Sequence, residues 1–139
     1  MKDMDLIRLA EEARKNAYAP YSGYTVGAAL LCADGTVSIG CNVENASYGA
    51  TVCAERVAVT RAVADGKCEF LAIAIAGGKA GRAPETFFSP CGICRQFLRE
   101  FCRDDFRILI GNGKEVVNQT LGKLLPNSFS SEAMQEIEP

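Results

Sequence analysis

The apolar run from Leu71 to Ala76 constrains the fold of this chain more than any other segment. It reads LAIAIA and carries no polar side chain. Six residues are far too few to cross a membrane as a helix, so the run is expected to form a short strand in the middle of a sheet. Such a strand needs covering layers on both faces, and the segments that precede and follow it have helical character.

The other elements follow from periodicity and turn residues. Apolar residues at helical spacing predict a helix that starts near the N-terminus, with Asp3 or Asp5 as its cap. Alanine-aspartate-glycine at 33–35 and asparagine-glycine at 112–113 predict hairpins. Strands are expected at 26–31, 36–43, 71–76, 107–110 and 115–118, and further helices at 51–64, 90–101 and 121–125. The order predicts one domain over residues 1–139, an α/β fold with a three-layer α/β/α sandwich and a mixed sheet of about five strands.

Composition and charge exclude several classes of protein. The chain has 139 residues, is 48% hydrophobic and 23% charged, and so resembles an ordinary globular domain. Its net charge is −2 and it has no run rich in Lys and Arg, which disfavours a nucleic acid polymer as partner. The first 15 residues carry acids throughout and lack the apolar core of a signal peptide. A cytoplasmic protein without a membrane partner is therefore expected.

The cysteine and histidine counts limit the available chemistry. There are seven cysteines and no histidine. An odd number of cysteines in a cytosolic setting disfavours a disulfide framework. Without histidine, acid–base chemistry near neutral pH requires a carboxylate, a tuned thiol or a metal-bound water, and a soft-metal site requires thiolate and carboxylate ligands.

Three of the cysteines stand at the starts of two predicted helices. Cys91 and Cys94 form a C-x-x-C pair, whose i and i+3 positions share a helical face, and Cys53 lies in the first turn of the other helix. Helix N-termini favour anions, which lowers thiol pKa and promotes the metal-binding thiolate form. Taken alone, the pair could be a redox couple or two small buried side chains, and Cys53 could be core packing. Cys32, Cys41, Cys68 and Cys102 have no partner at metal spacing and are interpreted as packing residues.

Two charged residues follow Cys53 within an apolar helix, in the stretch TVCAERVAV. Charge in such a setting is costly unless it is paired. Glu55 is two residues from Cys53 and therefore points to a different side of the helix, so it does not readily share a metal with that thiol. Arg56 is three residues from Cys53, lies on the same face and can donate to its thiolate.

These residues resemble a known family. The pattern C-A-E followed by P-C-G-I-C resembles the signature of zinc-dependent base deaminases, and the small cytidine deaminases with three cysteine ligands in particular. The similarity extends over nearly the whole chain. It includes the segments APYS at 19–22, VGAAL at 26–30, GCNVENASY at 40–48, CAER at 53–56, SPCGICRQ at 89–96, and LLP at 124–126 followed by Phe129.

The resemblance implies a function and a metal. It implies hydrolytic deamination of cytidine and 2′-deoxycytidine to uridine and 2′-deoxyuridine with release of ammonia, as in pyrimidine salvage, by a homotetramer with pockets shared between subunits. It implies one Zn²⁺ per subunit on Cys53, Cys91 and Cys94, with water in the fourth position, and Glu55 as the residue that moves protons. Arg56 would offset the negative charge of three thiolates.

The resemblance also implies contacts to a nucleoside. Asn42 and Glu44 project to one side of a strand end and suit ribose hydroxyls, although turn chemistry competes for Asn42. The other implied contacts are an aromatic ring on the pyrimidine, two backbone groups and two further aromatic residues: Tyr24, Ala54, Ser89, Tyr48 and Phe129. Tyr24 departs from the phenylalanine that relatives usually carry. Phe129 would reach a neighbour's pocket or cover the core.

Two alternatives remain at the level of sequence. The same chemistry could act on another aminated nucleoside, such as a nucleoside antibiotic. A structural zinc or thiol-redox module would explain the cysteines but leaves Glu55 without a role. The sequence does not distinguish a ribose from a deoxyribose preference.

Overall fold

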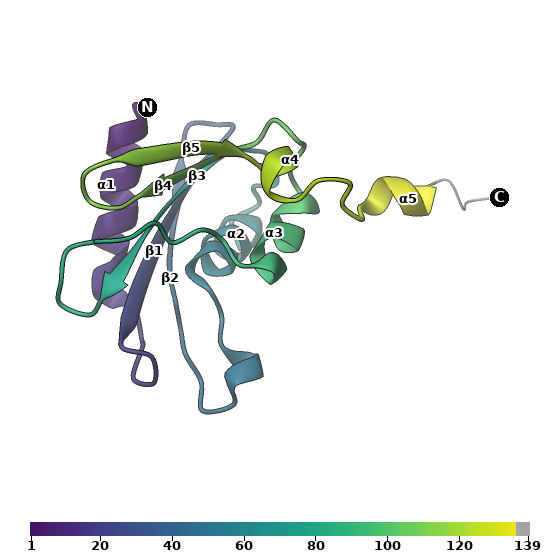
Figure 1. The fold of residues 1–139 in the computed structure, drawn as a ribbon. Coiled ribbons are helices and arrows are strands. Elements are labelled where there is room, and N and C mark those ends of the chain that lie inside the picture. Colours follow the sequence, from purple (N-terminus) through teal and green to yellow (C-terminus); the bar gives the residue numbers. More distant parts are fainter. Residues whose placement is uncertain (136–139) are drawn as a thin grey trace.

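Five strands form one mixed sheet in the computed structural model, which describes residues 1–135 (Figure 1). The strands are β1 (Tyr24–Cys32), β2 (Val37–Cys41), β3 (Phe70–Lys79), β4 (Arg107–Gly111) and β5 (Val116–Thr120). Their order across the sheet is β2-β1-β3-β4-β5. Strands β3 and β4 are parallel, and the other three neighbouring pairs are antiparallel. The predicted five-stranded mixed sheet with a hairpin at an edge is confirmed, and hairpins occupy both edges.

The apolar run at 71–76 lies in β3, which is the central strand as predicted and is longer than the run itself. Its side chains alternate between two cores. Ala72, Ala74 and Ala76 face one core, whereas Ile73 and Ile75 face the other. The small alanine side chains leave room for a helix to pack closely on their face of the sheet.

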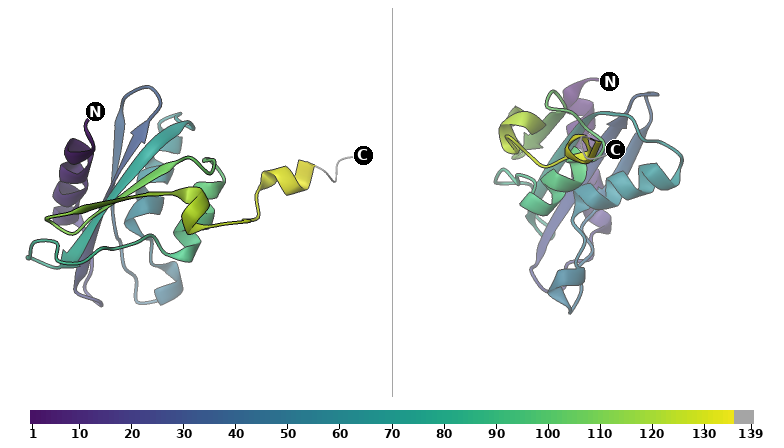
Figure 2. Two further views of the ribbon diagram at one scale, coloured as in Figure 1. Left: turned by 45° about the horizontal axis from the view of Figure 1, so that its top comes forward. Right: turned by 90° about the vertical axis from the view of Figure 1, so that its right-hand side faces the viewer.

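Helices cover both faces of the sheet. The helices are α1 (Asp3–Ala13), α2 (Ala54–Ala64), α3 (Gly92–Arg99), α4 (Leu121–Leu124) and α5 (Ser131–Gln135), with short 3-10 turns η1 (Arg14–Asn16) and η2 (Tyr48–Ala50). Helix α1 packs on the alanine face of β3, and α2 and α3 pack on the opposite face (Figure 1). The three-layer α/β/α prediction is therefore confirmed. The segment with α5 extends away from the sheet and its helices (Figure 2). None of the helices in the described residues is long and apolar enough to cross a membrane.

Three predicted helix starts differ from the structure. Helix α2 begins at Ala54 rather than residue 51, and α3 begins at Gly92 rather than Pro90, because Cys53 and Cys91 have extended backbone conformations and serve as N-caps. Their carbonyl groups accept the first helical hydrogen bonds, at 3.2 and 3.0 Å. At the N-terminus the cap is Lys2. The two predicted caps, Asp3 and Asp5, lie within the first helical turn, where their negative charges interact favourably with the helix dipole.

A close approach between β2 and α2 depends on Gly40. A Cβ atom at this position would meet the backbone of Ala54 and would lie 2.5 Å from the backbone nitrogen of Ala58. Both of those atoms belong to the helix backbone, which cannot move aside as a flexible side chain can. The missing side chain therefore sets the distance between the sheet and the helix that starts after Cys53.

We expect Gly40→Ala to lower the free energy of unfolding by about 1–3 kcal/mol, because the added methyl group overpacks a contact between backbones. Gly49→Ala is the matched control, since a Cβ there meets nothing within 4 Å. Urea unfolding of both variants checks the prediction. Equal stability of the two variants would show that α2 can shift without cost.

Candidate metal centre and ligand pocket

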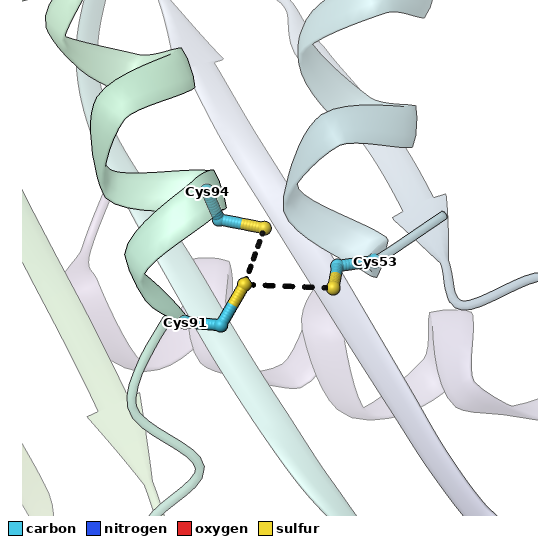
Figure 3. A group of neighbouring side chains, drawn as sticks. All are labelled: Cys53, Cys91 and Cys94. Atoms are coloured by element: carbon cyan, nitrogen blue, oxygen red, sulfur yellow. Dashed lines mark hydrogen bonds between the residues drawn. The ribbon is translucent and has the colours of Figure 1, made fainter. Parts of the chain in front are cut away.

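The three cysteines predicted as metal ligands lie together at the start of two helices. Cys53 caps α2, Cys91 caps α3, and Cys94 lies in the first turn of α3. The sulfur atoms converge between the two helix ends (Figure 3). The Sγ atoms of Cys53 and Cys91 are 3.8 Å apart, and those of Cys91 and Cys94 are 3.5 Å apart.

These separations fit a tetrahedral zinc site. Ligands at the corners of a tetrahedron, each about 2.3 Å from zinc, lie about 3.8 Å from one another. All three sulfur atoms lie within 4.8 Å of each other, and among residues 1–135 the cluster has three protein donors and no fourth. Three donors leave one coordination position for solvent or substrate, which is the arrangement of catalytic rather than structural zinc. The remaining four cysteines lie outside the cluster.

Those four cysteines differ in burial. Cys32 and Cys102 are buried, and Cys41 is half-buried, which agrees with packing roles. Cys68 is exposed, so its interpretation as a packing residue is wrong. It lies just beyond the end of α2, where the chain leaves the core before β3.

The environment of the cluster favours a thiolate at Cys53. A hydrogen bond from the Cys94 thiol, together with those from Arg56 and Cys91, lowers the pKa of Cys53 to about 5. The Nη2 atom of Arg56 lies 3.7 Å from the Cys53 sulfur and 3.2 Å from the carbonyl oxygen of Thr51. The pKa of Cys94 is raised because its proton is held by Cys53 and because it is buried. The predicted contact between Arg56 and Cys53 is thus present.

Glu55 is buried beside the cluster, with 4% of its surface exposed. It lies in the first turn of α2 and lines the same cavity as two of the cysteines. Burial raises its pKa from 4.5 to about 7, because a carboxylate loses its hydration there. A carboxyl group with that pKa can accept and release protons near neutral pH.

A cavity of about 360 Å³ opens next to the cluster. Its walls come from β1, the loops after β2 and β3, and the start of α2. The lining residues are Ser22, Tyr24, Val26, Asn42, Glu44, Thr51, Cys53, Ala54, Glu55, Ile75, Phe88, Ser89 and Cys91. The predicted residues that it brings together therefore include two sulfur ligands, the buried glutamate and five of the seven predicted substrate contacts.

Asn42 and Glu44 are held by the chain itself. The Asn42 side chain accepts the N–H of Val26 and donates to the carbonyl oxygen of Tyr24, both at 2.9 Å, and so extends the pairing of β1 and β2. The Glu44 carboxylate accepts the backbone N–H groups of Tyr21 and Ser22 at 3.0 Å and the Ser22 hydroxyl. Asn42 therefore has a structural role as well as a place in the cavity, as the competing interpretation from sequence allowed.

Phe88 is a lining residue that sequence reasoning left unassigned. Its ring centroid is 5.9 Å from that of Tyr24, and the two rings form an aromatic wall. A Cβ at Gly77 would lie 2.6 Å from the Phe88 ring, so this glycine in β3 makes room for it. Nothing local to the loop indicates this position; the pairing of β1 with β3 brings Tyr24 near Phe88.

Two predicted contacts lie outside the cavity. Tyr48 is 77% exposed and packs edge-on against Tyr21 in an adjoining hollow. Phe129 is 64% exposed on the segment that leads to α5, and its carbonyl oxygen accepts a hydrogen bond from Gln96. Within one chain, neither ring reaches the cavity.

Comparison with known proteins shows the family of this chain. The family model for the cytidine and deoxycytidylate deaminase zinc-binding region matches residues 1–110. A cytidine deaminase of Sporosarcina psychrophila is 45% identical over 91% of this chain and 90% of its own length. A cytidine deaminase of Halalkalibacterium halodurans is 43% identical over 94% of this chain and 96% of its own length.

Solved structures show the same fold. The crystal structure of cytidine deaminase from Burkholderia pseudomallei is similar with a TM-score of 0.84 and 45% identity, over 93% of this chain and all of that one. The cytidine deaminase structure from Mycobacterium tuberculosis gives a TM-score of 0.77 and 41% identity, over 93% and 98% of the two chains. With its three thiols, buried glutamate and matching sheet, the chain belongs to the cytidine and deoxycytidylate deaminase zinc-binding family.

Proposed function

We propose that this protein catalyses the zinc-dependent hydrolytic deamination of cytidine and 2′-deoxycytidine, which gives uridine and 2′-deoxyuridine and releases ammonia. The observation that carries the proposal is the position of Glu55, which is buried and lines one cavity with two of the three clustered cysteines. A structural zinc site requires a fourth protein ligand, and a dithiol redox pair leaves the third clustered thiol without a role. Glu55 therefore favours an enzyme.

The cofactor in this proposal is one zinc ion, held by Cys53, Cys91 and Cys94. A zinc ion bound there would supply a water molecule that ionises near neutral pH. The start of α2 and the start of α3 direct partial positive charge at the three sulfurs. Arg56 adds a full positive charge, and its Nη2 atom donates a hydrogen bond to the Cys53 sulfur at 3.7 Å. Together these groups moderate the negative charge of three thiolates.

Glu55 is proposed to move the protons of the reaction. As a carboxylate it takes a proton from the attacking water and delivers it to ring nitrogen N3 of the cytosine. The oxygen of that water bonds to ring carbon C4. Glu55 then takes the remaining proton from this oxygen and passes it to the exocyclic amine, and ammonia leaves as the C4–N bond breaks and the C4 carbonyl forms. Both steps require a carboxyl group that changes protonation state readily, and the pKa of about 7 meets that requirement.

The nucleoside contacts are proposed from the cavity lining. Glu44 and the second N–H of the Asn42 amide are available for ribose hydroxyls, because the first amide N–H is used by Tyr24. The ring of Tyr24 is proposed to pack on the pyrimidine, with Phe88 beside it. The backbone N–H of Ala54 and the carbonyl oxygen of Ser89 are proposed to bind the polar edge of the base.

We also propose an oligomeric state and a cellular location. The exposed Phe129, on a segment that extends away from the sheet, supports a homotetramer in which this ring enters a neighbour's pocket (Figure 2). Tyr48 would join the shared pocket in the same way. Residues 1–139 are proposed to act as one catalytic domain in the cytoplasm, within pyrimidine salvage.

A second substrate class has one observation in its favour. A blasticidin-S deaminase of Bacillus cereus is 28% identical over 93% of this chain. On a nucleoside antibiotic that carries the same aminated pyrimidine, the chemistry would be unchanged. The cytidine deaminases at 41–45% identity favour cytidine as the better substrate.

Ammonia release from a substrate panel tests the proposal directly. The panel contains cytidine, 2′-deoxycytidine, cytosine, cytidine 5′-monophosphate and blasticidin S. We expect turnover of the two nucleosides to exceed that of cytosine by roughly 100-fold or more, because the free base leaves the groups that would bind the ribose unpaired. If only blasticidin S is turned over, the proposal that cytidine is the substrate is wrong.

Removal of a sulfur ligand should remove the metal. We expect Cys53→Ala to lose bound zinc and to melt at a lower temperature, because metal binding stabilises the two helix starts that it joins. Cys68→Ala is the control, since this exposed cysteine lies outside the cluster. Zinc content by atomic emission and thermal melting check both variants. Zinc at the wild-type level in Cys53→Ala would refute the ligand assignment.

Glu55→Gln should retain zinc and lose turnover by several orders of magnitude, because an amide cannot carry protons. After zinc is removed by chelation, the same variant should melt at a higher temperature than the wild type above pH 7. A pKa raised from 4.5 to about 7 means that folding favours the protonated acid. That contribution is complete below pH 4.5 and is lost as the pH rises through 7. If the melting temperatures of the zinc-free variant and the zinc-free wild type differ by the same amount at pH 5 and at pH 8.5, the burial argument is contradicted.

A further inference from the structure

Arg95 is the most highly connected side chain near the metal centre that the mechanism does not use. Its guanidinium donates three hydrogen bonds to three different residues. The Nε atom donates to the carbonyl oxygen of Pro90 at 2.7 Å, and Nη2 donates to the Ser89 hydroxyl at 3.0 Å. The Nη1 atom donates to the carbonyl oxygen of Leu124 at 2.7 Å, in α4.

Two of these acceptors belong to the segment that presents Cys91. Ser89 and Cys91 line the cavity, and Pro90 between them is buried. This segment has no strand or helix of its own, because α3 begins only at Gly92. The conformation of the chain just before the sulfur ligand therefore depends on side-chain contacts, and Arg95 supplies two of them.

The third acceptor joins the same loop to the C-terminal part of the chain. Leu124 ends α4, which contacts α3 after the last strand of the sheet. The next residue of α3, Gln96, donates to the carbonyl oxygen of Phe129 at 3.0 Å. Consecutive residues of one helix thus bind the loop before the metal ligand and the segment that carries Phe129.

We propose that Arg95 is a positioning residue for the metal centre, which holds the loop at 89–91 so that the Cys91 sulfur and the Ser89 carbonyl keep their places. This inference rests on the proposed function, since it assumes that zinc occupies the three-cysteine cluster. Lysine cannot replace arginine here, because one ammonium group cannot span acceptors on two separate segments as a planar guanidinium does. Zinc should therefore leave an Arg95→Lys variant more easily, even when the fold is intact.

The test is the rate at which a chromogenic chelator extracts zinc from the purified, zinc-loaded protein without substrate. We expect Arg95→Lys to release zinc about 10–100-fold faster than the wild type, the usual effect of losing a group that orients a metal ligand. The absorption band of the cobalt-loaded variant, which arises from the thiolate ligands, should also shift. The value of kcat for cytidine should fall more than KM rises, because the loop affects the reacting groups.

Arg99→Lys is the matched control. Arg99 lies one turn further along α3, is half-buried, and donates to the Cys102 carbonyl and to Asp104, away from the three-cysteine cluster. Its substitution reports the effect of weakening α3 alone. Release from Arg95→Lys at the wild-type rate, or equal acceleration in both variants, would overturn the proposal.

A second variant covers failure of Arg95→Lys to fold. Ser89→Ala removes only the Nη2 acceptor and should still accelerate zinc release several-fold, and an unchanged rate would overturn the proposal. Because release is measured without substrate, the two proposals can fail separately. A wild-type protein that binds zinc but deaminates no nucleoside would refute the proposed function. The zinc-release rates would still test the role of Arg95.

Discussion

The convergence of two helix N-termini on one point is the constraint on which this structure depends. Cys53 and Cys91 cap α2 and α3, and both helices lie on the same face of the sheet. Capping residues have extended backbones, so their side chains lie at the helix start rather than along its side. The N-terminal ends of two helices thus lie beside the three sulfur atoms, and the positive ends of the helix dipoles favour the anionic form that binds metal.

This arrangement requires the helices to be held at an accurate distance from the sheet. Gly40 permits the backbone of β2 to approach α2, and the pairing of β1 with β3 aligns Tyr24 with the loop that carries Phe88. The apolar face of the central strand packs beneath the cavity, where Ile75 is a lining residue. Packing and chemistry are therefore coupled, because a change in helix position would move the sulfur atoms relative to Glu55.

Electrostatics divide the charged residues of the site into two groups. Glu55 is deeply buried and has a raised pKa, so its charge state changes near neutral pH. Glu44 is nearer to solvent and accepts hydrogen bonds from Ser22 and Tyr21, which lower its pKa and keep it ionised. Two carboxyl groups on one cavity thus have different properties, because one is desolvated and the other is hydrogen-bonded. This difference suits one to proton transfer and the other to binding hydroxyl groups.

The amino-acid sequence by itself determined the strands, the central position of β3 and the presence of cysteines at the starts of two helices. Local signals suffice for these features: an apolar run, turn residues, and cysteines at i and i+3 beside a helix start. That Cys53 joins Cys91 and Cys94 was implied by the family resemblance, and the tertiary structure brings the three sulfur atoms together. The sequence did not determine that Phe88 joins the cavity, that Cys68 is exposed, or that Tyr48 and Phe129 lie outside the cavity of their own chain. It also left open which groups Arg95 binds. One acceptor, Ser89, is near Arg95 in the sequence, but another, Leu124, is far from it. Only the tertiary structure decided these points, because each depends on the distance between segments far apart in the chain, and no local pattern of residues encodes that distance.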